Sequence, residues 1–163
     1  MSEHLNALLQ DNNDAINQYL TFILADEEYG VEILQVQEIR SWEKPTRIPN
    51  TPPYVLGLIN LRGTVVPVID LRRRFDMEQI EYDESTVLMI AKIKHEKGVR
   101  TMGLIVDAVS DVCDILPEQI KPSPDFGGVV GSEYIKGLAH NDTNMIILLD
   151  LELLVNEGVI AEA

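Results

Sequence analysis

Only one cysteine, Cys113, occurs in the 163 residues, so the chain cannot form an internal disulfide. A lone thiol within the apolar run VSDVCDIL fits a reducing compartment, and apolar surroundings favour a small buried side chain over a reactive one. The start of the sequence has neither a basic leader nor an apolar stretch of signal-peptide length. The apolar runs elsewhere fall far short of the roughly 20 residues that a membrane helix needs. These absences predict a soluble cytoplasmic protein.

Positive charge is also scarce. Lys and Arg total 13 against 27 acidic residues, for a formal net charge of −14. Such a field repels nucleic acid and anionic lipid, so a partner must be engaged through local patches. The one basic run, Arg72-Arg73-Arg74, lacks interleaved aromatics and is typical of a solvated helix face or of local ion pairs. We therefore expect no nucleic-acid binding and no direct membrane binding.

Motifs for catalysis, metal binding and phosphate binding are missing. The three histidines are scattered, and no Cys/His pair has the spacing of metal ligands. Neither a Gly-x-Ser-x-Gly elbow nor a Walker-type loop is present, so we expect no metal and no cofactor. Asp70 and Asp150 leave one alternative open, a small hydrolase with paired carboxylates. Each, however, ends an apolar run before a possible helix, where an aspartate typically acts as the N-cap.

The chain does contain a series of short apolar runs rich in β-branched and aromatic residues. They are bounded by Gly, Asn, Asp or Pro and include YLTFIL (19–24), VVPVIDL (65–71), STVLMIAKI (85–93) and NMIILLDL (144–151). Several such runs with turns between them favour an all-β barrel or sandwich over βαβ units. The polar residues 1–17 predict a loose N-terminal tail.

The strongest organisational feature is an internal repeat. YVLGL at 54–58 and YIKGL at 134–138 lie 80 residues apart, and at the same offset 65–71 matches 145–151. Upstream, 30–39 matches 103–112 at an offset of 73, and the Pro- and Gly-rich segment KPSPDFGGVVG holds the extra residues. Two similar small β-barrels are expected. Neither half has much core alone, so we expect them to pack on each other.

Comparison of the two copies separates architecture from candidates for binding. Gly57 and Gly137 occur at equivalent positions, which favours a backbone requirement shared by both barrels. Arg62 differs, because Arg62-Gly63 corresponds to Asp142-Thr143 in the second copy. The fold therefore does not demand this arginine. We interpret Arg62 as a contact displayed to a partner protein.

Longer blocks make a family resemblance specific. The segments 19–39 (YLTFILADEEYGVEILQVQEI) and 46–75 (TRIPNTPPYVLGLINLRGTVVPVIDLRRRF), followed by MGLIVDAVSDV, LPEQIKPSPDF and SEYIKGL, closely resemble the CheW family of bacterial chemotaxis coupling proteins. The resemblance implies an all-β fold of two similar five-stranded Src-homology-like β-barrel halves packed on a shared apolar seam, with short helices. It places the CheW-like domain at 18–157 between tails at 1–17 and 158–163, with halves of about 18–82 and 83–157 whose strands are free to interleave.

The resemblance further implies a non-enzymatic scaffold that works without a cofactor. Such an adaptor links the cytoplasmic tips of chemoreceptors (methyl-accepting chemotaxis proteins) to the regulatory domain of the histidine kinase CheA, in arrays at the membrane. An adaptor of a non-flagellar signalling pathway stays open as an alternative. Pseudo-symmetric halves also suggest head-to-tail contacts with the kinase or with other copies of the chain, which can close into rings.

The family, at matching positions, and the comparison of the two repeat copies together supply the candidate contact residues. A receptor tip is an α-helical hairpin, so the expected binding mode is a helix in the groove between the barrels. The receptor-binding candidates are Ile33, Val36, Glu38, Ile39, Arg62, Val109 and Val112. Alternation does not separate a groove face from a core face, so a core role stays open for the apolar ones. The kinase-binding candidates are Gly57, Lys121, Phe126 and Gly137.

Overall fold

The computed structural model describes Asn6 and residues 17–122, 132–140 and 144–159, which contain ten strands. The strands are β1 (Gln18–Leu24), β2 (Glu27–Glu32), β3 (Val36–Ser41), β4 (Val55–Leu61), β5 (Thr64–Asp70), β6 (Val87–His95), β7 (Gly98–Val106), β8 (Ala108–Asp114), β9 (Ile135–His140) and β10 (Met145–Leu149). Short helical elements connect or follow them: η2 (Ile33–Gln35), α2 (Leu71–Arg74), η3 (Pro117–Gln119), η4 (Ser132–Tyr134), α3 (Leu151–Leu153) and η5 (Leu154–Val159).

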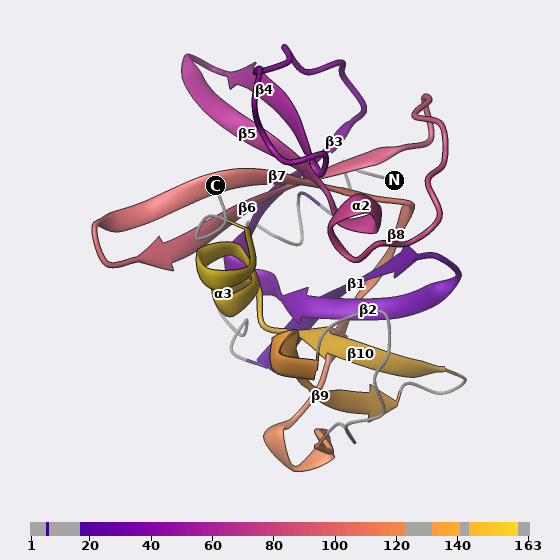
Figure 1. The fold of residues 1–163 in the computed structure, drawn as a ribbon. Helices are drawn as coiled ribbons and strands as arrows, with labels where there is room; N and C mark the ends of the chain where they lie inside the picture. The colour runs from indigo at the N-terminus through magenta and orange to yellow at the C-terminus, as the bar shows by residue number, and fades with distance from the viewer. Residues whose placement is uncertain (1–5, 7–16, 123–131, 141–143, 160–163) are drawn as a thin grey trace.

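The strands form two five-stranded sheets, one in the lower and one in the upper half of Figure 1. Sheet A has the order β8-β1-β2-β10-β9, and sheet B has the order β3-β6-β7-β5-β4. Neighbouring strands are antiparallel except for one parallel pair in each sheet, β2 with β10 and β5 with β7. The expected all-β fold of two similar five-stranded halves is confirmed.

Each sheet draws strands from both copies of the repeat. The hairpin β1–β2 joins β8, β9 and β10, and the hairpin β6–β7 joins β3, β4 and β5. A division of the sequence near residue 82 therefore separates the repeats but not the sheets, which interleave. The repeat identifies equivalent strands, but the choice of pairing partner depends on tertiary packing.

One isolated backbone bridge closes each sheet toward a barrel. Thr46 and Leu58 exchange N–H···O bonds of 2.8 Å in sheet B, and Lys121 and Leu138 exchange bonds of 2.8 and 2.7 Å in sheet A. Both bridges lie at equivalent places, because Leu58 and Leu138 occupy the same position in the two repeats. The two sheets thus share their closure as well as their strand order.

Buried side chains form three clusters. Sheet B encloses one that includes Ile59, Val66 and Val68, and sheet A encloses a smaller one that includes the equivalent residues Ala139, Ile146 and Leu148. The largest cluster lies between the sheets and combines strand residues of both, such as Phe22 and Met89, with Leu71 of α2 and Leu151 of α3. This third cluster is the shared apolar seam that the sequence predicts.

The two aspartates at the strand ends act as helix caps. Asp70 accepts a hydrogen bond of 2.9 Å from the backbone N–H of Arg72, and Asp150 accepts one of 3.0 Å from Leu153. The N-cap prediction is confirmed for both.

The basic run on α2 forms local contacts. Arg72 makes a two-pronged pair with Asp107, at 2.7 and 2.5 Å. Arg74 lies over the rings of Tyr54 and Tyr134, 5.5 and 5.6 Å from their centroids. Because these tyrosines are repeat equivalents, Arg74 links the two halves at the seam. Local pairing, one of the two expectations for this run, accounts for both arginines.

Candidate functional site

Arg62 lies at the tip of the hairpin between β4 and β5. Its φ of 50° and the bond of 2.8 Å from the Gly63 N–H to the Asn60 side chain define a tight turn. The turn projects the arginine into solvent, and 64% of its side chain is exposed. The sequence therefore identified a residue that the hairpin does display.

Glu38 on β3 holds this arginine. The Arg62 guanidinium donates a hydrogen bond of 2.5 Å to the Glu38 carboxylate, while Arg40 approaches the other oxygen at 3.8 Å. The hydrogen bond from Arg62 lowers the pKa of Glu38, with smaller contributions from the charges of Arg62 and Arg40. Glu38 itself is mostly covered, at 19% exposure. The pair brings together two candidates that are 24 residues apart in the sequence.

The lowered pKa of Glu38 predicts a measurable titration. A carboxyl whose folded pKa is depressed stays ionised above that pKa, and its pairing is lost as pH falls through it. In Arg62→Gln we expect the midpoint of Glu38, followed by carboxyl NMR, to move up toward the ordinary value of about 4.3. Arg47→Gln, which removes an exposed arginine elsewhere, should leave it unchanged. Equal midpoints in the wild type and Arg62→Gln would contradict the pairing.

The apolar receptor candidates are mostly inside the protein. Ile33, Val36, Ile39 and Val109 are all below 7% exposure and belong to the seam cluster, and Val112 is half-buried against it. Alternation could not distinguish these positions, and burial now assigns four of them to the core of the free protein. A partner reaches their surroundings rather than the side chains themselves.

Two exposed apolar residues near these positions were missed. Leu34 follows Ile33 in η2 and is 54% exposed, and Val65 follows the Arg62 turn at 62% exposure. The exposure of Val65 agrees with strand alternation, because its neighbour Val66 is fully buried, but the apolar run VVPVI shows no alternation in the sequence. Leu34 has no sequence signal either, because it lies in a helical turn between two strands.

Asn6 was also missed. Its side-chain amide accepts from the Ile39 N–H at 2.8 Å and donates to the Ile39 carbonyl at 3.2 Å. Because β3 is the edge strand of sheet B, this amide substitutes for a neighbouring strand. Sequence patterns carry no sign of a contact across 33 residues.

The kinase candidates separate into backbone and side-chain positions. A Cβ on Gly57 would lie 2.1 Å from the Thr46 carbonyl oxygen, and one on Gly137 would lie 2.4 Å from the Ile120 side chain and 2.9 Å from the Lys121 carbonyl oxygen. Both glycines let the closing bridge approach its strand, which is the shared backbone requirement expected from the repeat.

The remaining kinase candidates lie on the 117–126 segment. The backbone of Lys121 forms hydrogen bonds with Leu138, and the residue is exposed at the surface. Phe126 lies outside the described residues.

Among the residues that the structure describes, no group of three or more His, Cys, Asp or Glu is placed to hold a metal ion. Likewise, no helix in the described segments has the length and apolar character to cross a membrane.

Cys113 is expected to react slowly in the folded protein. Burial, followed by the charges of Glu28, Asp111 and Asp114, raises the pKa of its thiol to about 11. Since only the thiolate attacks disulfide reagents, labelling at pH 8 should be on the order of 100-fold slower than in urea-unfolded protein. Ellman's reagent measures both rates, and equal rates would contradict the effect of burial.

Comparisons with known proteins give a consistent family. Residues 18–159 match the family described as CheW-like domain. Among curated proteins, the chain is 44% identical over 144 residues to the chemotaxis protein CheW of Klebsiella aerogenes, covering 88% of this chain and 84% of that protein. It is 36% identical over 145 residues to the probable chemotaxis protein CheW of Rhizobium etli, covering 89% and 91%.

A solved structure agrees in fold. The crystal structure of the scaffolding protein TtCheW from Thermoanaerobacter tengcongensis matches with a TM-score of 0.76 and 35% identity, covering 87% of this chain and 90% of that one. The agreement extends over both sheets rather than over one motif.

Proposed function

Because the chain belongs to the CheW-like domain family, we propose that it is a non-enzymatic chemotaxis scaffold that couples the cytoplasmic tips of chemoreceptors to the regulatory domain of the kinase CheA. The observation that carries the proposal is Arg62, displayed at a hairpin tip and oriented by Glu38. The second copy of the repeat has Asp142-Thr143 there, so the arginine is not a demand of the fold.

The receptor-binding face includes the hairpin tip and the surface over the seam. Arg62 supplies an oriented charge, and Leu34 and Val65 supply exposed apolar area. A polar rim around an apolar centre suits the side of a helical hairpin. The buried candidates Ile33, Val36, Ile39 and Val109 act from beneath by setting the shape of this surface, together with Val112, which is half-buried against the same cluster.

We propose that the kinase-binding face lies near the bridges that close the sheets. Lys121 is exposed there, and Phe126 is retained as an anchor from the family resemblance. Gly57 and Gly137 contribute through the path of the backbone, since neither has a side chain to offer. The pseudo-symmetry of sheets A and B supports head-to-tail contacts with the kinase or with further copies of the chain in rings.

The protein acts in the cytoplasm and joins membrane-associated arrays through the receptors. Its own surface charge, at a net −14, disfavours direct contact with anionic lipid. Catalysis is not needed for this role, and the capping function accounts for Asp70 and Asp150, the two carboxylates of the hydrolase alternative.

Co-sedimentation with receptor-bearing membranes and a pull-down of CheA test the proposal together. The wild-type chain is expected in the pellet only when receptor is present, and CheA is expected in the eluate. Absence of both interactions from folded protein would refute the proposal. Recovery of a kinase and receptor outside flagellar chemotaxis would instead identify the alternative pathway.

A further inference from the structure

A hollow of about 760 Å³ lies between the loop that joins β3 to β4, the start of β4, α2 and the segment before β6. Its lining residues are Trp42, Lys44, Pro45, Arg47, Ile48, Pro49, Asn50, Thr51, Pro52, Pro53, Val55, Leu56, Arg73 and Tyr82. We call it the Trp42 hollow. None of these lining residues is a proposed receptor or kinase contact, such as Glu38 or Arg62. A volume of this size accommodates a peptide-sized ligand rather than a single small ion.

The lining of the Trp42 hollow has the opposite charge to the rest of the chain. Among the described residues, it contains three cationic side chains and no aspartate or glutamate, although acids outnumber bases 27 to 13 in the sequence. Lys44 and Arg47 form no ion pair with any residue in the described part of the chain. The surface therefore concentrates positive charge at one recess of a strongly acidic protein.

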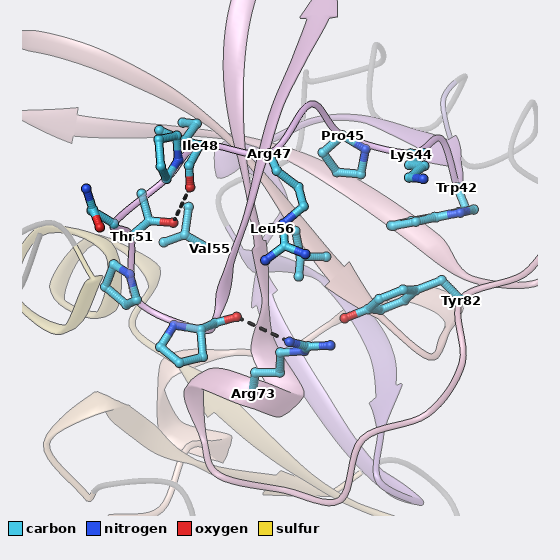
Figure 2. A pocket seen from close by; sticks show the side chains of 14 residues that line it. Trp42, Lys44, Pro45, Arg47, Ile48, Thr51, Val55, Leu56, Arg73 and Tyr82 are labelled. Atoms are coloured by element: carbon cyan, nitrogen blue, oxygen red, sulfur yellow. Dashed lines mark hydrogen bonds between the residues drawn. The ribbon is translucent and has the colours of Figure 1, made fainter.

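Arg47 and Arg73 direct their guanidinium groups into the same space, from the loop and from α2 respectively (Figure 2). In the part of the chain that the structure describes, no carboxylate lines the space between them. Arg73 is paired through its Nε with Asp70 at 3.5 Å, which does not line the hollow, whereas Arg47 has no ion pair among the described residues. A carboxylate bound between the two guanidinium groups therefore reduces the repulsion that remains between them. A planar guanidinium is also the side chain best suited to bind a carboxylate with two parallel hydrogen bonds.

Other contacts hold one wall of the hollow in place. The Trp42 and Tyr82 rings are stacked, with centroids 4.5 Å apart, and Arg73 lies 6.0 Å above the Tyr82 ring. Asp70 binds this wall from behind, because it accepts from the Tyr82 hydroxyl and lies 3.5 Å from the Arg73 Nε. Burial raises the pKa of Tyr82 to about 12, so this hydroxyl remains a donor. The wall is thus organised before any ligand arrives, which lowers the entropy cost of binding.

Much of the remaining lining is apolar and stiff. Four prolines line the hollow, and their fixed φ angles restrict the loop. Ile48, Val55 and Leu56 add apolar surface beside the two arginines. A ligand that matches both walls carries an apolar side chain next to a carboxylate.

We propose that the Trp42 hollow binds a short acidic segment of a partner protein, with a carboxylate between Arg47 and Arg73 and an adjacent apolar side chain against the proline-lined wall. A short segment with one or two carboxylates meets the local positive charge. A nucleic acid or an anionic membrane extends over the acidic remainder of the surface and is repelled there.

Trp42 is the sole tryptophan of the chain, so its fluorescence reports directly on the hollow. The probe is a capped hexapeptide, Ala-Glu-Leu-Glu-Phe-Ala, titrated into the full-length protein. We expect a saturable change in Trp42 emission. A matched peptide with glutamine in place of both glutamates should bind at least about tenfold more weakly, as expected for the loss of a charge-assisted hydrogen bond.

Three variants locate the site. Arg47→Gln removes an exposed charge from the hollow and should weaken the acidic peptide about tenfold, with an unchanged melting temperature. Lys97→Gln removes the same charge at the exposed β6–β7 turn and should bind as the wild type does. Arg62→Glu should also retain peptide binding, which separates this site from the proposed receptor contact.

Three results would overturn the proposal. They are no saturable change with the acidic peptide, equal binding of the glutamine peptide, and unaltered binding to Arg47→Gln. Inorganic phosphate provides a further arm. If phosphate gives a saturable change at these concentrations and the acidic peptide gives none, the hollow binds a small oxyanion and the peptide proposal is excluded.

Discussion

Replacing Gly57 with alanine is expected to lower the free energy of unfolding by about 3–5 kcal/mol, a large share of the total for a domain of this size. The Gly57 φ of 143° is a conformation that L side chains rarely adopt. An added Cβ would lie 2.1 Å from the carbonyl oxygen and 2.7 Å from the carbonyl carbon of Thr46. These are backbone atoms of the bridge that closes sheet B, so relief of the clash breaks hydrogen bonds to Leu58. Urea unfolding followed by far-ultraviolet circular dichroism measures the loss.

Gly63→Ala is the matched control. Gly63 also has a positive φ, of 88°, but a Cβ there meets nothing within 4 Å. Its expected cost is the conformational strain alone, about 1–2 kcal/mol. If both variants lost the same stability, crowding at the bridge would not be the reason for Gly57. The stability of the variant also decides how its binding is interpreted. If Gly57→Ala unfolds the protein, a loss of kinase binding does not show that Gly57 contacts the kinase.

Reversing the charge of Arg62 is expected to weaken receptor binding by about 10- to 100-fold while the melting temperature stays nearly unchanged. In Arg62→Glu the new carboxylate faces Glu38, so the oriented positive charge is replaced by two like charges that repel. Stability changes little because most of the Arg62 side chain is in solvent. Co-sedimentation with receptor-bearing membranes and a melting curve are the two measurements.

Lys97→Glu is the control for charge reversal at a hairpin tip, because Lys97 is exposed in the turn between β6 and β7. It should bind receptor normally. The double variant Glu38→Arg with Arg62→Glu exchanges the positions of the two charges and so restores the ion pair. Rescue by this exchange would indicate that the pair only holds the hairpin, whereas continued loss supports a direct contact of Arg62. Full binding by the single Arg62→Glu variant would refute either role.

Several features of the fold were predictable because they depend on local chemistry that the repeat shows twice. Asp70 and Asp150 cap their helices as expected, since each follows an apolar strand and precedes free N–H groups. Gly57 and Gly137 occupy equivalent close approaches of backbone. Arg62 could be singled out by the opposite reasoning, because the second copy lacks it.

The site was less predictable, since it depends on contacts between distant segments. Glu38 was already a candidate, yet its pairing with Arg62 spans 24 residues and follows no periodic pattern. Four of the apolar candidates are buried. The sequence could not predict this, because a strand face that lines a groove and a strand face that packs in a core show the same alternation of apolar residues. No sequence pattern indicates the hydrogen bond between the Asn6 amide and Ile39 on the edge strand β3.

The amino-acid sequence was sufficient for the strand content, the twofold repeat, the caps and the family, because each rests on neighbouring residues or on ordered blocks of them. The tertiary structure alone decided which strands pair. Sheet A combines the hairpin β1–β2 with strands β8–β10, and sheet B combines strands β3–β5 with the hairpin β6–β7. The tertiary structure also turned Arg47 and Arg73 toward one recess. Both outcomes depend on long-range packing of side chains, whose energy is absent from any local stretch of the chain.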